Sequence, residues 1–153
     1  MEIIETQKNG YLISTDPALL DIPRIHAFLS SHSYWAPGVS LPVVEKAARR
    51  SLCFGLYRLG PGEPAAERPE QAGFARVITD FATQARLVDV FVLPEHRGRG
   101  LGLWLVETVL DHPELRDLPR WTLSTLDAHA LYARFGFRTI ANPEMQMERV
   151  RGR

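Results

Sequence analysis

Residues 92–102, with the sequence VLPEHRGRGLG, combine residue types that suit the binding of an anion. A strongly apolar stretch ends at Pro94, and three glycines follow among arginines before an apolar helical pattern begins. The first amides of a helix have no partner within the helix, and the helix dipole adds partial positive charge there. Glycines let the backbone approach a phosphate closely. The predicted phosphate site consists of Arg97, Gly98, Arg99, Gly100, Leu101 and Gly102.

The residues present exclude two common phosphate-binding motifs. A Walker loop ends in Gly-Lys-Ser/Thr, and this stretch contains no lysine. A dinucleotide-binding fingerprint needs a glycine where this chain has Leu103, and it needs an acidic residue for the ribose near position 122, where none is found. The phosphate ligand is therefore expected to be of another kind.

The segments around this site predict a mixed α/β fold in a single domain over residues 1–153. The expected strands cover residues 11–15, 51–59, 71–80, 85–93, 120–125, 137–140 and 145–150. The expected helices cover residues 19–31, 41–50, 101–110 and 127–137, and residues 60–70 are expected to form a hairpin loop. The nearly continuous apolar run at 85–93 is typical of a strand buried on both faces. Because one helix separates them, the strands at 85–93 and 120–125 are expected to be parallel neighbours.

Two motifs resemble those of one known family. The pattern Arg97-x-x-Gly100-x-Gly102 after an apolar strand resembles the acetyl-CoA pyrophosphate motif of the GNAT superfamily of N-acetyltransferases. The stretch DAHALYARFGF at 127–137 resembles a second motif of that family, with an alanine, a Leu-Tyr pair and a Gly-Phe ending. Both motifs at this separation are more specific than either alone, and the resemblance covers roughly residues 71–140.

The resemblance implies a GNAT-like central sheet, mixed and splayed, flanked by about four helices. Acetyl-CoA would lie as co-substrate in the split between the strands at 85–93 and 120–125. Its pantetheine arm would bind backbone groups at Phe91, Val92 and Leu93. Asp127 stands where many members have an asparagine that contacts the cofactor, and its simplest role in the fold is the N-cap of the following helix.

Acetyl transfer to an amine needs groups that handle protons. By resemblance, the hydroxyl of Tyr132 reaches the thioester sulfur as an acid, although the apolar stripe on which this residue lies also suits a core position. The attacking amine must lose its proton to a base or to water. Asp89, beside the expected split, and Asp80, at the end of the preceding strand, are the candidate bases. The alternatives are pairing with an arginine across the sheet for Asp89 and a turn for Asp80.

Tyr34 and Trp35 lie between the first two helices, where members of the family often bind the acceptor. Aromatic side chains there suit stacking on a substrate or caging of a cation, and they equally suit packing of the helices onto the sheet. We expect transfer of an acetyl group to a primary amine of a small molecule by direct attack in a ternary complex. A protein or peptide amine acceptor is one alternative, and a catalytically silent acyl-CoA-binding sensor is another.

The composition limits the expected binding partners and the expected cellular compartment. The formal net charge is +0, which gives no electrostatic footprint for nucleic acid. No apolar run approaches the roughly 20 residues of a membrane span. Cys53 is the only cysteine and is expected to be inert core, so no internal disulfide forms and a cytoplasmic location is the simplest expectation. No metal is expected, and the habit of small members of the superfamily suggests a homodimer.

Overall fold

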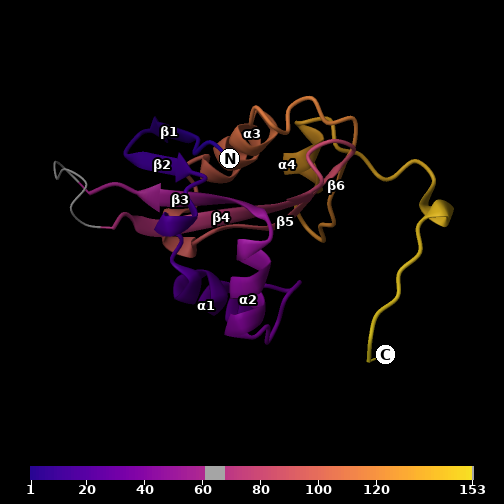
Figure 1. Cartoon of the computed structure of the whole chain (residues 1–153), viewed down its shortest axis with the longest axis horizontal. Coiled ribbons are helices and arrows are strands. Elements are labelled where there is room, and N and C mark those ends of the chain that lie inside the picture. The colour runs from indigo at the N-terminus through magenta and orange to yellow at the C-terminus, as the bar shows by residue number, and fades with distance from the viewer. Residues whose placement is uncertain (61–67, 153) are drawn as a thin grey trace.

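The computed structural model describes residues 1–60 and 68–152, in which six strands form one mixed sheet in chain order (Figure 1). The strands are β1 (Glu5–Lys8), β2 (Tyr11–Ser14), β3 (Leu52–Arg58), β4 (Glu70–Thr79), β5 (Ala85–Val92) and β6 (Trp121–Thr122). From β1 to β5, neighbouring strands are antiparallel, whereas β5 and β6 are parallel. The predicted mixed sheet and its parallel pair are therefore confirmed.

Four helices cover the two faces of this sheet. They are α1 (Ile22–His32), α2 (Leu41–Arg49), α3 (Leu101–Leu110) and α4 (His129–Ala133). Helices α1 and α2 lie on one face, and α3 and α4 lie on the other (Figure 1). Two apolar clusters fill the layers, one around Phe28 and Phe91 under α1 and α2, the other around Phe54 and Leu105 under α3. None of the described helices is long and apolar enough to cross a membrane.

Local sequence signals explain where the helices begin. Helix α1 starts after Asp21, whose carboxylate accepts a hydrogen bond from the Arg24 amide at 3.1 Å, and Pro23 occupies its first turn. Helix α3 starts at Gly100, whose φ of 74° is a left-handed conformation that glycine adopts without strain. Asp21, Pro23 and Gly100 can all be recognised in the sequence as helix-start signals, and they determine where α1 and α3 begin.

The pair formed by β5 and β6 is short, and this opens the sheet. The two strands pair only through Ala85 with Trp121 and Arg86 with Thr122. Strand β5 then runs on to Val92, and on its other side it remains paired with β4. A split therefore separates the carboxyl-terminal half of β5 from the chain that follows β6, as the splayed sheet of the resemblance implies.

Several expected elements differ in the structure. The strands predicted at 137–140 and 145–150 are wrong, because these residues have no partner strand and contain only a short 3-10 turn at Pro143–Met145. The helix predicted at 127–137 and the strand predicted at 120–125 are real but shorter. Strand β1 was not predicted, because its sequence ETQK is polar and mostly exposed. Within the predicted hairpin loop, residues 61–67 lie outside the described residues.

Gly73 on β4 allows the close approach of β5. A Cβ atom at Gly73 would lie 2.7 Å from the carbonyl oxygen of Phe91 and 2.9 Å from Cδ2 of Leu56. We predict that Gly73→Ala lowers the free energy of unfolding by about 1–3 kcal/mol, because a backbone carbonyl has to move to make room. The matched control is Gly60→Ala, where a Cβ meets no atom within 4 Å. Equal urea-unfolding midpoints for both variants would contradict this tight spacing.

Candidate active site

The loop between β5 and α3 has the conformation that its glycines predict. Gly98 has a φ of 79° and Gly100 a φ of 74°, both in the left-handed region that other residues rarely adopt. No side chain caps α3. The first amides of this helix, beginning at Leu101, are therefore available to a ligand at the end of the split.

Gly102 has a different reason to be glycine. Its φ is not positive, and a Cβ there would lie 3.9 Å from Cγ2 of Val92, which is an ordinary contact. The fold alone would therefore accept alanine at this position. A ligand that approaches the first turn of α3 closely would explain the missing side chain.

Basic side chains surround this loop. Arg97 folds back, and its Nε donates a hydrogen bond to the carbonyl oxygen of Val92 at 2.9 Å. Arg99 is exposed and lines two adjoining hollows, one shared with Lys8 and the other with Arg58. Sequence reasoning missed Lys8 and Arg58, because only the sheet brings the β1–β2 turn and the end of β3 beside the loop.

Of the three residues expected to bind the pantetheine arm, the structure leaves Val92 most available. The Leu93 amide donates to the Ala72 carbonyl at 2.8 Å, and the Leu93 carbonyl accepts from the His96 amide at 2.9 Å. Phe91 pairs with Phe74 on β4, and its side chain is buried under α1. Because backbone polar groups alternate sides along a strand, those of Val92 face the split, where Arg97 reaches its carbonyl.

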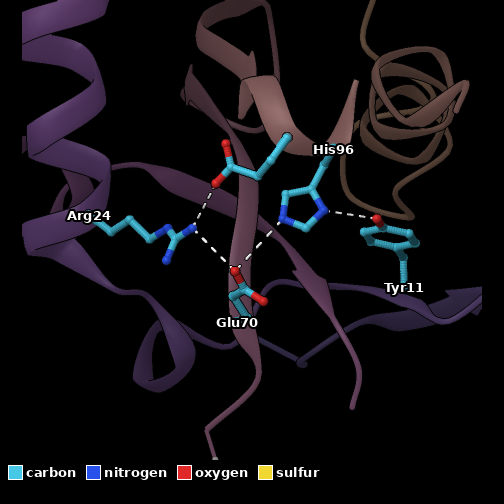
Figure 2. A network of polar contacts seen from close by, with 5 residues as sticks. Tyr11, Arg24, Glu70 and His96 are labelled. Atoms are coloured by element: carbon cyan, nitrogen blue, oxygen red, sulfur yellow. Dashed lines mark hydrogen bonds and ion pairs between the residues drawn. The ribbon is translucent and has the colours of Figure 1, made fainter. Parts of the chain in front are cut away.

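A polar network fixes the turn before the loop (Figure 2). His96 is buried; its Nδ1 hydrogen-bonds the Tyr11 hydroxyl at 2.9 Å, and its Nε2 lies 3.9 Å from Glu70. Arg24 on α1 donates to the carboxylates of Glu70 at 3.3 Å and Glu95 at 3.1 Å. The two glutamates and His96 are close enough to share a cation, but the Arg24 guanidinium already pairs with both carboxylates. The network therefore ties β2, β4 and α1 to the base of the loop.

Asp89 lies in a β-bulge in the middle of β5. The register with β4 shifts by one extra residue between Phe74 and Arg76, and Asp89 has a φ of 55°. Its carboxylate accepts hydrogen bonds from Nε of Arg76 at 2.7 Å and from the indole of Trp35 at 3.1 Å. Pairing with an arginine across the sheet, the alternative left open by the sequence, is confirmed. Both carboxylate oxygens are engaged, which makes Asp89 a poorly placed base in this state.

Asp80 lies in the turn between β4 and β5. Its carboxylate accepts hydrogen bonds from the amides of Ala82 and Thr83 and from the Thr83 hydroxyl. These bonds, led by that of the Thr83 side chain, hold the pKa of the Asp80 carboxyl well below its usual range. The turn interpretation is confirmed, and an exposed carboxylate that holds its proton so weakly is a poor base.

The residues before and within α4 are placed differently from expectation. Asp127 is exposed, and the N-cap of α4 is Ala128, whose amide donates to Oγ1 of Thr125 at 3.0 Å. The N-cap interpretation of Asp127 is therefore wrong, because the helix begins one residue later than that role requires. His129 is exposed, as expected for a residue off the apolar stripe.

Tyr132 is a core residue with a protonated hydroxyl. Its ring packs in the apolar cluster under α3 and meets Phe137 edge-on at 5.9 Å between centroids. Burial, with smaller contributions from Tyr34 and Asp127, raises the pKa of Tyr132 to about 12. No hydrogen bond joins its hydroxyl to any residue of the described ranges 1–60 and 68–152, so this donor is free for a ligand.

The aromatic pair before α2 reaches across the split. Tyr34 and Trp35 are 48% and 40% exposed, and their rings meet edge-on at 5.0 Å. The Tyr34 hydroxyl accepts a hydrogen bond from the Leu126 amide at 2.7 Å, and Trp35 donates to Asp89. Packing alone would bury these rings more fully. The pair therefore forms a half-open wall between β5 and the chain after β6.

Cys53 lies in the core under α2, as expected of an inert thiol. It is buried, and its sulfur donates to the carbonyl oxygen of Ala48 at 3.5 Å. Burial raises the pKa of this thiol to about 12, so the nucleophilic thiolate is suppressed.

Known proteins resemble this chain in sequence and in fold. A family model described as an acetyltransferase (GNAT) domain matches residues 65–139. The protein FG08082 of Gibberella zeae, assigned as an acetyltransferase, is 39% identical over 141 residues, which cover 83% of this chain and 78% of that protein. A crystal structure of xcc2953 from Xanthomonas campestris, assigned to the GNAT family, has a TM-score of 0.83 and 46% identity, covering 94% of this chain and 95% of that one.

A more distant structure shows the same fold with a ligand. Rv2747 from Mycobacterium tuberculosis, solved in complex with CoA and NLQ, has a TM-score of 0.59 and 20% identity. The match covers 78% of this chain and 68% of that one. At this identity the likeness is one of fold.

Gly102 provides a test of the phosphate site that leaves the fold intact. We predict that Gly102→Glu weakens acetyl-CoA binding at least about tenfold, because its carboxylate would meet the pyrophosphate at the amides of α3. Gly102→Ala is the matched control for stability, since its Cβ makes only an ordinary contact with Val92. Calorimetric titration with acetyl-CoA measures the affinity of both folded variants. An unchanged affinity in the glutamate variant would contradict a phosphate site at this loop.

Proposed function

Because the chain belongs to the GNAT superfamily of acetyltransferases, we propose that it transfers the acetyl group of acetyl-CoA to a primary amine of a small molecule. The observation that carries this proposal is the split beside β5, which has a glycine loop with free helix amides at one end. Along the same split stand the half-open wall of Tyr34 and Trp35 and the free hydroxyl of Tyr132. In this proposal, a phosphate-bearing donor and an acceptor would meet along one edge of β5.

The donor would follow the open edge of β5. Its pyrophosphate would accept hydrogen bonds from the first amides of α3, with Arg99 adding positive charge. An amide of its pantetheine arm would pair with the backbone of Val92, in the way that a further strand would. Arg97, which holds the Val92 carbonyl in this structure, would then turn toward the phosphates.

The acceptor would enter beside Tyr34 and Trp35. Two half-exposed aromatic rings next to the Asp89 carboxylate favour a compound that carries a cationic amine. A peptide amine remains the alternative acceptor, since the same wall is open to solvent on one side.

In the proposed reaction, the ammonium group of the acceptor first loses a proton to water, and the neutral amine then attacks the thioester carbonyl carbon and forms a tetrahedral intermediate. Its collapse breaks the bond from carbon to sulfur, and the nitrogen loses its proton to water. A thiol has a pKa of about 8.5, whereas that of Tyr132 is raised to about 12. Complete proton transfer from Tyr132 to sulfur is therefore uphill. The hydroxyl would instead stabilise the departing thiolate as a hydrogen-bond donor, and solvent would supply the proton.

Tyr132→Phe isolates this hydroxyl. We predict a loss in kcat of about tenfold to a few hundredfold, with acetyl-CoA affinity and Tm nearly unchanged. Stability should persist because the ring still packs against Phe137 and no hydrogen bond within the described residues is lost. Measuring kcat and thermal unfolding on one preparation separates the two roles. A variant with wild-type turnover would show that Tyr132 is a core residue only.

Asp89→Asn tests whether Asp89 positions the acceptor wall or takes the proton. Asparagine tolerates a positive φ and keeps one carbonyl acceptor for Arg76 or Trp35, so the bulge should survive. We expect KM for the acceptor to rise several-fold while the pH profile of kcat/KM keeps its shape. A flattened acidic limb would instead identify Asp89 as the base. Asp117→Asn, at a carboxylate that is 92% exposed, is the matched control.

The proposed reaction itself is tested by the release of free thiol from acetyl-CoA in the presence of an amine panel. The panel contains small amines, such as amino acids and polyamines, and peptides with a free amino terminus. Turnover on small amines supports the proposal. Turnover on peptides alone would show that the acceptor is a peptide amine instead. Acetyl-CoA binding without turnover on any amine would identify an acyl-CoA sensor. We propose the cytoplasm as the compartment, in keeping with a buried, unpaired thiol at Cys53.

A further inference from the structure

The turn before the glycine loop contains a buried ring nitrogen without a partner. His96 is 2% exposed, and its Nδ1 is hydrogen-bonded to the Tyr11 hydroxyl at 2.9 Å. Its Nε2 is buried and makes no hydrogen bond to any residue of the described ranges 1–60 and 68–152. This nitrogen is directed at Glu70 (Figure 2), whose carboxylate oxygen lies 3.9 Å away, too far for a hydrogen bond. A polar atom buried in this way requires a partner.

Two carboxylates lie beside this nitrogen. Glu70 is the first residue of β4, and Glu95 precedes His96 in the 3-10 turn Pro94–His96. One oxygen from each glutamate and one ring nitrogen of His96 all lie within 4.8 Å of one another. An imidazole nitrogen and two carboxylate oxygens are ligands that suit a divalent transition-metal ion such as Zn²⁺.

The charges at this place are incompletely balanced. Arg24 donates to Glu70 at 3.3 Å and to Glu95 at 3.1 Å, so one guanidinium charge faces two carboxylate charges. Among the residues that the structure describes, no other lysine or arginine pairs with either glutamate. A divalent ion would balance both carboxylates. It would also give Nε2 of His96 the partner that the guanidinium does not provide.

We propose that Glu70, Glu95 and His96 bind a divalent transition-metal ion such as Zn²⁺, and that this ion displaces the Arg24 guanidinium. The ring ligand would be Nε2, while the Nδ1–H group would donate to the Tyr11 hydroxyl and fix the orientation of the ring. Water would complete the coordination. The ion would connect β4 to the turn from which the glycine loop starts. This inference does not depend on the proposed acetyl transfer.

The ligand atoms need only small movements to hold the ion. Two ligand atoms on a tetrahedral zinc ion, with bonds of about 2.1 Å, lie about 3.4 Å apart. The Glu70 oxygen, now 3.9 Å from Nε2 of His96, has to approach it by about half an ångström. The side chains of Glu70 and Glu95 are 49% and 54% exposed, which leaves them room to turn. The Arg24 side chain is 35% exposed and can turn into solvent, since exposed ion pairs of this kind contribute little to stability.

Titration calorimetry with ZnCl₂ on the tag-free chain, without acetyl-CoA, tests the site. We expect one ion to bind per chain and Glu95→Gln to weaken binding at least about tenfold, because a charged ligand is lost at an exposed position. His96→Asn should weaken it similarly and keeps an amide group for Tyr11. If this variant does not fold, Glu70→Gln, also at an exposed side chain, takes its place. The matched control is His129→Asn, at an exposed histidine outside the cluster, which should bind zinc as wild type does.

Arg24→Gln provides a test of opposite sign. Removing the competing guanidinium should tighten zinc binding several-fold, whereas a guanidinium with a structural role alone would leave zinc affinity unchanged. Arg116→Gln, at an exposed arginine that pairs with Asp117, is the matched control. In crystals grown with Zn²⁺, anomalous scattering should place the ion about 2.0–2.1 Å from Nε2 of His96.

Four results would overturn the proposal. They are a wild type that binds no zinc, a zinc affinity that Glu95→Gln leaves unchanged, an ion located away from His96, and binding that appears only in Arg24→Gln. The last result would show that the guanidinium holds the place permanently in the native chain. Mg²⁺, which prefers oxygen ligands, should bind far more weakly than Zn²⁺. Equal affinity for the two ions would indicate an acidic surface cluster in place of a site built around the histidine.

Discussion

The open edge of β5 is the constraint on which the site depends. Buried backbone amides and carbonyls need hydrogen-bond partners, and beyond Arg86 the strand has a neighbour on one side only. In this structure the Arg97 side chain supplies one substitute partner at Val92. In the proposed complex, the amide groups of acetyl-CoA would supply further partners along this open edge.

The carboxyl end and the middle of that open edge are held by different means. At the carboxyl end, positive-φ glycines and the network of Tyr11, His96, Glu70 and Arg24 fix the loop before α3. At the middle, the bulge directs Asp89 toward Arg76 and Trp35. A left-handed conformation at a residue other than glycine costs about 1–3 kcal/mol, and the ion pair and the indole hydrogen bond offset this strain. The bulge thereby connects β5, the strand proposed to bind the donor, to the aromatic pair of Tyr34 and Trp35 proposed to bind the acceptor.

The parts of this site that are local in sequence could be predicted from it. The glycine loop is contiguous, and its chemistry follows from the spacing of Gly98, Gly100 and Gly102 alone. For Asp89 the sequence offered an arginine across the sheet as a partner but could not identify Arg76, because their pairing depends on a register shift that leaves no mark in the residue types. Lys8 and Arg58 reach the loop only through the strand order.

Residues 137–150 show what the periodicity of apolar residues cannot predict. The alternation of Met145 and Met147 predicted a strand at 145–150, but alternation alone does not show whether a strand edge is available to pair with it. Among the described residues, no strand edge pairs with 137–140 or 145–150, and the strands predicted there do not form. The alternation of apolar residues shows which side chains a strand could bury, whereas the topology of the sheet determines whether a strand edge is there to pair with it.

The buried hydrogen bond between Tyr11 and His96 joins positions 85 residues apart and has a consequence for how the protein folds. Contacts within α3 are local and form quickly. A contact between such distant positions forms more slowly, because closing a long loop costs chain entropy. The amino-terminal hairpin leaves the ribosome well before β5 is synthesised. It has to wait for β3, β4 and β5 before Tyr11 can meet its partner. The glycine loop before α3 is therefore among the last parts of the chain to become ordered, and nascent chains should acquire it only near the end of folding.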